Sequence, residues 1–221
     1  MADPNIKDNT MDSPMMRYVT NSPHHRMGRL GLVTLCLMFS SWQVVLAQTN
    51  LKDYGVILVG GGSSIPGWGS TTERVKTVDI IPRYCHILNA DMGQGWYQAN
   101  HELWIEMPFS YIASDSDPQD SGDIGIFSAN FLAALVFQPH RALNPYVSAG
   151  GGPVYVAADI EGVGSDLCGN YMAGAGIRLK ASALRYFNVE ARYHHVSNLN
   201  MADPNVPLNS LKIMLGMTIR F

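Results

Sequence analysis

Residues 208–221 read LNSLKIMLGMTIRF, and this stretch decides the fold because two kinds of side chain alternate along it. Successive side chains of a β-strand point to opposite faces, so every second residue shares a face. One face includes Lys212, Thr218 and Arg220, whereas the other is apolar from Leu211 to Phe221. The apolar set is Leu211, Ile213, Leu215, Met217, Ile219 and Phe221. A strand with one lipid-compatible face and one polar face is typical of a transmembrane β-barrel.

The same two-residue period recurs through most of the chain, whereas the 3.6-residue period of a helix is poor throughout. Between residues 95 and 108, Asn100, Glu102 and Glu106 alternate with Leu103 and Ile105. Clusters of Gly, Pro, Asn and Asp separate the segments. The predicted strands are 54–59, 75–88, 95–108, 124–138, 145–157, 168–180, 185–197 and 208–221.

The connections between these segments alternate in length. Short connections cover 89–94, 139–144 and 181–184, and longer ones cover 60–74, 109–123, 158–167 and 198–207. Outer-membrane barrels place short turns in the periplasm and long loops outside, with an even number of strands. The sequence therefore predicts an all-β fold over residues 48–221, an eight-stranded antiparallel transmembrane β-barrel of the outer membrane.

The inward-facing positions of the predicted barrel carry charges of both signs. Asp79 and Arg83 share one face of their strand, as Glu102 and Glu106 do in the next. An eight-stranded barrel is too narrow for a water channel, so such charges must compensate one another. We therefore expect a buried polar plug and no pore. The alternative fold, a soluble barrel or sandwich, would bury the apolar faces and expose the polar ones.

The first residues have the composition of an export signal. Arg26 and Arg29 precede the apolar run 30–39, and residues 45–47 (VLA) offer small or slim side chains for a signal peptidase. The apolar run is shorter than the ~20 residues that a membrane-spanning helix needs. We expect an N-terminal extension and signal peptide over residues 1–47, removed by cleavage after Ala47.

Composition excludes one class of partner. The chain has 221 residues, of which 47% are hydrophobic and 15% are charged, and its formal net charge is −3. This is enough material for one domain and too apolar for a disordered segment. Because the basic residues form no run and no stripe interleaved with aromatics, we exclude nucleic acid as a partner.

The cysteines are expected to remain thiols. Cys36 falls within the predicted signal peptide, whereas Cys85 and Cys168 fall near opposite ends of the predicted barrel. A disulfide needs Cα atoms within about 7 Å, and a strand rises about 3.3 Å per residue. We therefore predict that Cys85 and Cys168 are free.

Strand 185–197 departs from its apolar pattern at one end. Its outward series runs from Phe187 to Tyr193 and continues with His195 and Ser197. Residues i and i+2 of a strand point the same way, so this imidazole and hydroxyl are neighbours. A serine oxygen becomes a good nucleophile when an imidazole takes its proton, and a third group commonly fixes the imidazole tautomer. Spacing alone also fits two ordinary polar residues at the headgroup level.

The C-terminal hairpin resembles that of a known family. The segments RYHHVSN (192–198), PN (204–205) and LNS (208–210), together with Phe221, are similar to the C-terminal hairpin of the PagL-type lipid A 3-O-deacylases. The stretches MPFSY (107–111), NPYV (144–147) and GGG (150–152) are similar as well. The resemblance implies an eight-stranded outer-membrane esterase. Its partner would be the lipid A of lipopolysaccharide in the outer leaflet, from which it removes the 3-O-linked hydroxyacyl chain.

The resemblance also implies roles for individual residues. His195 would be the base and Ser197 the nucleophile. The family pattern adds a Glu in the facing strand; this chain has none there, and Asn209 occupies the equivalent position. An amide oxygen can accept the imidazole N–H and fix its tautomer, but it cannot stabilise an imidazolium by charge. Asp203 is the nearby carboxylate that could substitute, and the amide of Asn198 is the candidate for holding the oxyanion.

Other polar features do not indicate a cofactor. No His, Cys and Asp set has metal-ligand spacing, and no helical pattern follows the glycine runs 60–62 and 150–152. We predict no cofactor. His194 faces the lumen, where we expect it to pair with Glu190 or Glu102. The predicted function is an outer-membrane serine esterase acting on lipid A; the alternative is a non-enzymatic small barrel with a structural or adhesive role.

Overall fold

The structure is a computed structural model that describes residues 52–65, 74–113, 125–158, 160 and 162–220. The predicted signal peptide over residues 1–47 lies outside the described residues. Within the described ranges, no helix is both long enough and apolar enough to span a membrane.

The described residues form one antiparallel sheet of ten strands and a short 3-10 helix, η1 (Gly95–Tyr97). The strands are β1 (Asp53–Ser64), β2 (Lys76–Met92), β3 (Ala99–Glu106), β4 (Phe109–Ile112), β5 (Gly125–Ser128), β6 (Asn130–Phe137), β7 (Leu143–Ala157), β8 (Leu167–Lys180), β9 (Arg185–Ser197) and β10 (Leu208–Arg220).

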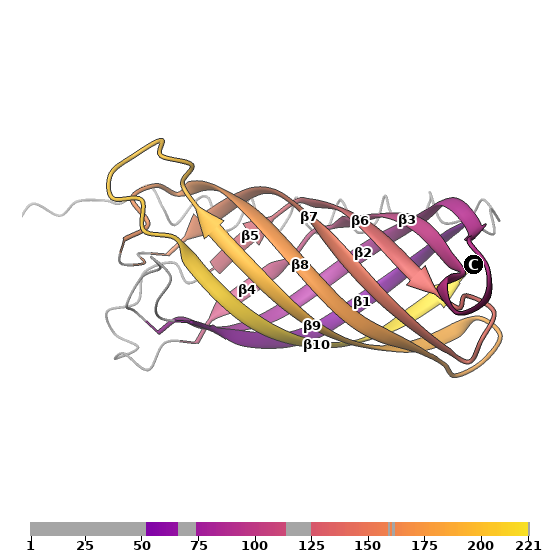
Figure 1. Ribbon diagram of the computed structural model, residues 1–221. Coiled ribbons are helices and arrows are strands. Elements are labelled where there is room, and N and C mark those ends of the chain that lie inside the picture. The colour runs from indigo at the N-terminus through magenta and orange to yellow at the C-terminus, as the bar shows by residue number, and fades with distance from the viewer. Residues whose placement is uncertain (1–51, 66–73, 114–124, 159, 161, 221) are drawn as a thin grey trace, which may run out of the picture. The chain divides into compact units, whose positions relative to one another are not determined.

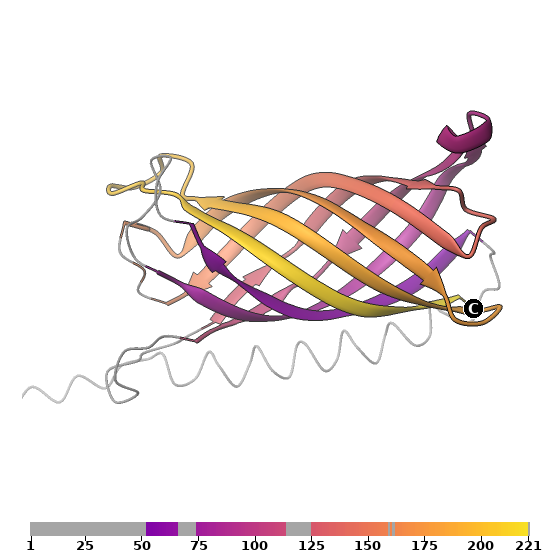
Figure 2. The ribbon, with the colours of Figure 1, turned by 60° about the horizontal axis from the view of Figure 1, so that its bottom comes forward.

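The sheet closes into a barrel because β1 pairs with both β2 and β10 (Figures 1 and 2). β2 pairs with both β3 and β4, so β3 and β4 together form one strand of the barrel wall, interrupted at Met107-Pro108. β7 pairs with both β5 and β6, which together form another strand of the barrel wall, interrupted at Ala129. When β3 with β4 and β5 with β6 are each counted as one strand, the described strands make the eight-stranded antiparallel barrel that the sequence predicts.

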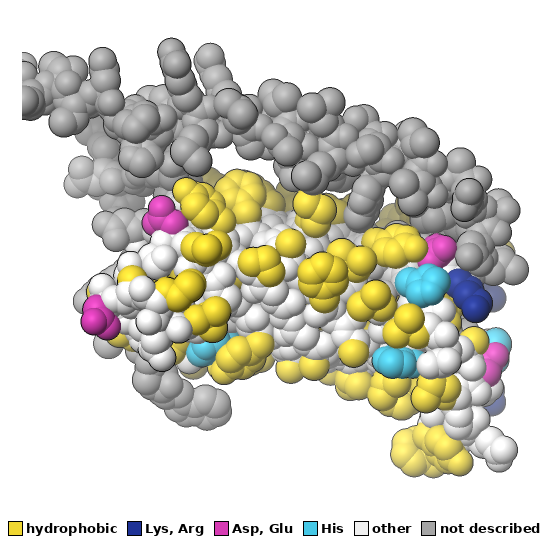
Figure 3. All heavy atoms as spheres, turned by 90° about the horizontal axis from the view of Figure 1, so that it is seen from above, with side chains coloured by type: hydrophobic (Ala, Val, Ile, Leu, Met, Phe, Trp, Pro, Cys, Tyr) yellow, Lys and Arg dark blue, Asp and Glu magenta, His cyan; other side chains and the backbone are white. Residues whose placement is uncertain are grey.

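The two faces of the wall separate by polarity, as predicted. Along β10, Leu211, Ile213 and Leu215 are exposed, whereas Lys212 and Met214 are buried. Figure 3 shows hydrophobic side chains spread over the visible flank of the barrel and charged side chains near its two ends. Such an apolar outer band is the surface that a bilayer solvates.

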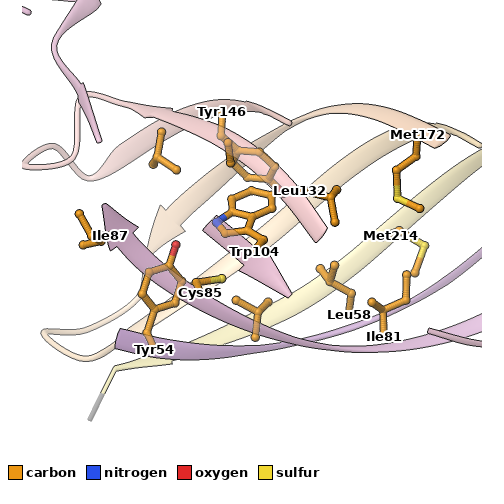
Figure 4. Close-up of a cluster of buried hydrophobic side chains, with 13 residues drawn as sticks. Tyr54, Leu58, Ile81, Cys85, Ile87, Trp104, Leu132, Tyr146, Met172 and Met214 are labelled. Atoms are coloured by element: carbon orange, nitrogen blue, oxygen red, sulfur yellow. The ribbon is translucent and has the colours of Figure 1, made fainter. Parts of the chain in front are cut away.

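Two clusters of apolar side chains fill parts of the interior. The larger contains Trp104 and Tyr146, whose rings meet edge to face at 5.3 Å between centroids, with Leu58 and Met214 farther along (Figure 4). The second lies where the longer connections join the strands. It consists of Val75, Ile112, Ile126, Val154, Val156, Ile160, Cys168, Val196 and Leu208.

A buried ionic network confirms the predicted polar plug. Glu106 accepts hydrogen bonds from Arg83 Nε at 2.7 Å and from Arg192 Nη1 at 2.8 Å. Arg83 also donates to Glu190 at 2.7 Å, and Glu190 accepts from Arg192 as well. These side chains come from β2, β3 and β9, so the network connects strands on different sides of the barrel through the lumen. Charges of opposite sign thus satisfy one another where water cannot.

The first strand is longer than predicted. Residues 60–64 were expected to belong to a connection, but β1 continues through Gly60–Gly62 to Ser64. Their neighbours explain the composition: a Cβ added at Gly61 would lie 2.3 Å from the carbonyl oxygen of Thr77 on β2. Glycine here permits close approach of the backbone instead of ending the strand.

Both remaining cysteines are free, as predicted. Cys85 lies on β2 beside Tyr54 of β1, and Cys168 lies on β8 beside Val154 of β7. Each is buried in a different apolar cluster, so the two sulfur atoms are kept apart by the interior of the barrel.

We predict that Glu106→Gln destabilises the barrel by about 3–5 kcal/mol, because it leaves two buried guanidinium groups with one carboxylate between them. The measurement is the free energy of unfolding in urea, made in lipid vesicles. The exposed Asp166 provides the control, and Asp166→Asn should change stability by less than about 0.5 kcal/mol. Equal unfolding of wild type and Glu106→Gln would show that the plug contributes no stability.

Candidate active site

The candidate site lies on the hairpin of β9 and β10, at the barrel end where the longer connections leave the wall (Figure 1). Val196 and Leu208 pair across this hairpin and are both buried in the second apolar cluster. Since neighbouring residues of a strand alternate in direction, His195 and Ser197 are held on the outer face by the packing of Val196 inside. The outward direction of His195, which the esterase hypothesis requires, is present.

His195 makes a direct contact with Asn209 on the facing strand. The two residues are register partners, and His195 Nδ1 lies 2.7 Å from Asn209 Oδ1. An amide oxygen only accepts hydrogen bonds, so Nδ1 must donate. In a neutral imidazole this leaves the lone pair on Nε2, the nitrogen that is free to act as a base.

The surroundings of Asn209 hold its side chain in place. Asn209 is only 6% exposed, although Leu211 on the same face of β10 is 57% exposed. Tyr193 donates its hydroxyl hydrogen to Asn209 Oδ1 at 2.8 Å. The amide oxygen therefore accepts two hydrogen bonds beneath the neighbouring rings, and it is an ordered partner for the imidazole.

A tyrosine from the next strand covers the imidazole. Tyr171 on β8 is the register partner of His195, and the two rings stack with 4.1 Å between centroids and 19° between planes. Tyr171 was not predicted from the sequence, and Tyr193 was predicted only as part of the outward series of its strand. Alternation places Tyr171 on the outer face, but its register against His195 depends on the connection between β8 and β9.

Ser197 lies two residues beyond His195 on the same face, opposite Gly169 of β8. Gly169 has no side chain, and the side chain of Leu199 lies over it, because a Cβ added at Gly169 would be 3.0 Å from Leu199 Cδ1. Among the described residues, no hydrogen bond joins Ser197 to His195. Hydrogen bonds between a nucleophile and its base are commonly long or poorly aligned before substrate binds.

Asn198 fastens the connection between β9 and β10. Its backbone N–H donates to Asn205 Oδ1 at 3.0 Å, and its side-chain nitrogen donates to the carbonyls of Ala202 at 2.8 Å and Pro204 at 3.0 Å. Both donors are engaged, so an oxyanion role for Asn198 requires one of these bonds to open. Asp203 is exposed in the same connection, and no contact joins its carboxylate to His195 within the described residues.

His194 faces the lumen, as predicted, but does not have the expected partner. Its Nε2 is buried and has no hydrogen-bond partner among the described residues, because Glu190 is engaged by Arg83 and Arg192. Across all of the residues that the structure describes, no three His, Cys, Asp or Glu side chains lie close enough together to hold a metal ion.

Comparison with known families is decisive. Residues 87–218 match the family described as lipid A 3-O-deacylase (PagL), and the match includes β9, β10 and the hairpin that carries the site. The chain belongs to the PagL family. This confirms the resemblance found in the sequence and assigns the barrel to the outer membrane.

Three solved structures of outer-membrane proteins are similar to this chain, and the fold is supported by the one with a TM-score above 0.5. The structure of Neisserial surface protein A (NspA) has a TM-score of 0.55 and 14% identity, covering 77% of this chain and 97% of that chain. The outer-membrane enzyme PagL has a TM-score of 0.48 and 20% identity, covering 76% and 99%. OprG from Pseudomonas aeruginosa has a TM-score of 0.41 and 10% identity, covering 77% and 96%. No sequence among the curated proteins matches this member of the PagL family.

We predict that Asn198→Ala loosens the connection between β9 and β10. It removes two side-chain hydrogen bonds worth about 1 kcal/mol each, which corresponds to a roughly thirtyfold larger open population. The measurement is the rate of proteinase K cleavage within residues 199–207 of the folded barrel. Met201→Ala, which trims an exposed side chain of the same connection, is the control and should leave the rate unchanged. Cleavage of Asn198→Ala at the wild-type rate would contradict the role assigned to Asn198.

Proposed function

We propose that this member of the PagL family is a serine esterase of the outer membrane that removes the 3-O-linked acyl chain of lipid A. Ser197 is the nucleophile, His195 is the general base and then the general acid, and Asn209 orients His195. The family supports deacylation of lipid A, and the geometry of the hairpin supports the assignment of roles.

The observation that carries the proposal is the hydrogen bond between His195 Nδ1 and Asn209 Oδ1. It fixes the tautomer in which Nε2 is unprotonated, and only that tautomer can take a proton from Ser197. A pair of polar residues without a catalytic role would not need a buried third side chain to orient one of them. The arrangement therefore has the three parts of a Ser-His hydrolase, with an amide in the orienting position.

The reaction follows from these parts. Ser197 Oγ attacks the ester carbonyl carbon while its proton passes to His195 Nε2. The carbon–oxygen bond to the sugar breaks, and His195 returns the proton to the departing sugar hydroxyl, which leaves an acyl group on Ser197. Water then attacks this acyl group, loses a proton to His195, and releases the fatty acid as the proton returns to Ser197.

The position of the site suits a lipid substrate. His195 and Ser197 lie on the outer wall, and exposed apolar residues of the same hairpin, including Leu211 and Ile213, extend from them along the barrel. The end of the barrel with the longer connections is the extracellular one in proteins of this architecture. The site therefore faces the outer leaflet near the boundary between headgroups and acyl chains, where the esters of lipid A are found.

We predict that Ser197→Ala and His195→Ala each lower deacylation by at least about 10⁴-fold, because each removes an obligatory participant in proton transfer. The measurement is mass spectrometry of lipid A from cells that express the chain. Wild type should remove one hydroxyacyl mass, and both variants should leave lipid A intact. Ser165→Ala in another connection is the control. Unchanged lipid A with wild type in the outer membrane would leave a barrel without this activity and refute the proposal.

We predict that Asn209→Ala lowers kcat by only roughly tenfold to a hundredfold, because the nucleophile and base remain and only the orientation is lost. Asn209→Glu should preserve or raise kcat, since a carboxylate accepts the same N–H and also stabilises the imidazolium. The measurement is initial-rate kinetics in mixed micelles of lipid A. Full activity of Asn209→Ala together with inactive Asp203→Ala would assign the orienting role to Asp203 instead.

A further inference from the structure

The stacked contact between Tyr171 and His195 is not required by the fold. Both side chains point out of the barrel, where lipid or headgroups would otherwise surround them, and Tyr171 remains 55% exposed. The rings are nevertheless nearly parallel at 4.1 Å between centroids. Tyr171 and Tyr193, in contrast, are 6.4 Å apart and tilted by 43°. The close parallel arrangement thus singles out the imidazole among the outward neighbours of Tyr171.

The charges around His195 explain why such a contact matters. The groups that face it are Tyr171 from β8, Tyr193 and Ser197 from β9, and Asn209 from β10. Among the described residues, no carboxylate forms a hydrogen bond or an ion pair with its imidazole. Behind the wall lie His194, Arg192 paired with Glu106 and Glu190, and Lys212 paired with Asp79, so the carboxylates there are already engaged by other cations. Within the described part of the chain, a proton arriving on His195 therefore has no carboxylate in direct contact with it.

An aromatic face supplies the missing attraction. The π-system of a tyrosine ring is negative on its face, and a cation placed over that face is stabilised. Stacking uses the face of the imidazole and leaves its nitrogens free to form hydrogen bonds, so Nδ1 keeps its bond to Asn209 Oδ1, and Nε2 forms none within the described residues. The outer torsion of a histidine is otherwise broad, and the flat contact restricts it.

We propose that Tyr171 is a positioning residue of this site, whose ring fixes the plane of His195 and stabilises the imidazolium that forms when Ser197 gives up its proton. The inference rests on the proposed esterase function. It gives the tyrosine the electrostatic part of the task that a carboxylate would perform and leaves Asn209 with the orientation of the tautomer.

The test is a series of substitutions at Tyr171 in the full chain, assayed in micelles containing lipid A. Tyr171→Leu should lower kcat roughly tenfold with KM nearly unchanged, because the interaction strengthens only as charge develops. Tyr171→Phe keeps the aromatic face and should retain most of kcat. The control is Tyr111→Leu, the same change at another exposed tyrosine of the wall, on β4, and it should leave kcat unaltered.

A double-mutant cycle separates this role from a structural one. In the Asn209→Glu background a carboxylate faces the imidazolium, so Tyr171→Leu should then lower kcat by no more than about twofold. Equal losses in both backgrounds would overturn the proposal, as would a wild-type kcat for Tyr171→Leu or a loss confined to KM.

A second readout keeps the proposal distinct from the assignment of the substrate. A fluorophosphonate probe labels an activated serine: Ser197 Oγ forms a bond to phosphorus, fluoride leaves, and the proton passes to His195. Labelling of Ser197 should slow roughly tenfold in Tyr171→Leu and remain near the wild-type rate in Tyr171→Phe. Wild type that is labelled but leaves lipid A intact would refute the proposed substrate alone. Labelling of Tyr171→Leu at the wild-type rate would refute the role of Tyr171.

Discussion

The backbone pairing of β1 with β10 closes the sheet, from Tyr54 opposite Arg220 to Ser64 opposite Ser210, and the rest of the structure depends on it. A peptide group in hydrocarbon has no water to bond, so a sheet with a free edge would not be stable there. Closure also creates an interior, and the ionic network of Arg83, Glu106 and Arg192 becomes possible only within it. The outer wall is then free to be largely apolar, and it is on this wall that β9 presents His195 and Ser197.

Much of this arrangement could be predicted from alternation alone. The period of β10 gives its two faces, and the same rule places His195 outside and lets Asn209 reach it across a hairpin. Alternation does not encode the register between neighbouring strands, which decides the residues that lie opposite each other. The stacking of Tyr171 on His195 depends on such a register, and the length of β1 depends on the close approach of Gly61 to β2. Neither this register nor the end of β1 could be predicted from the residue pattern, because both depend on how neighbouring strands pack.

The same segment of β9 carries both the candidate site on its outer face and part of the apolar interior on its inner face. Val196 lies between His195 and Ser197 and packs inward against Leu208, so any movement of the backbone that carries the two outward side chains must disturb a buried apolar cluster. Asn198 continues this restraint into the following connection with its three hydrogen bonds. The hairpin thus behaves as a rigid support, which is what a reaction sensitive to the positions of an imidazole and a hydroxyl requires.

The outward direction of His195 and Ser197 also determines how molecules meet them. A group in the lumen would be reached only by small solutes, whereas these two face the plane of the bilayer. Under the proposed function, a lipid would arrive there by lateral diffusion, and the fragments of the cleaved lipid would be released beside the wall. Encounter is then governed by the number of substrate molecules per unit area of leaflet, so crowding and fluidity of the membrane, rather than concentration in water, set how often the site is filled.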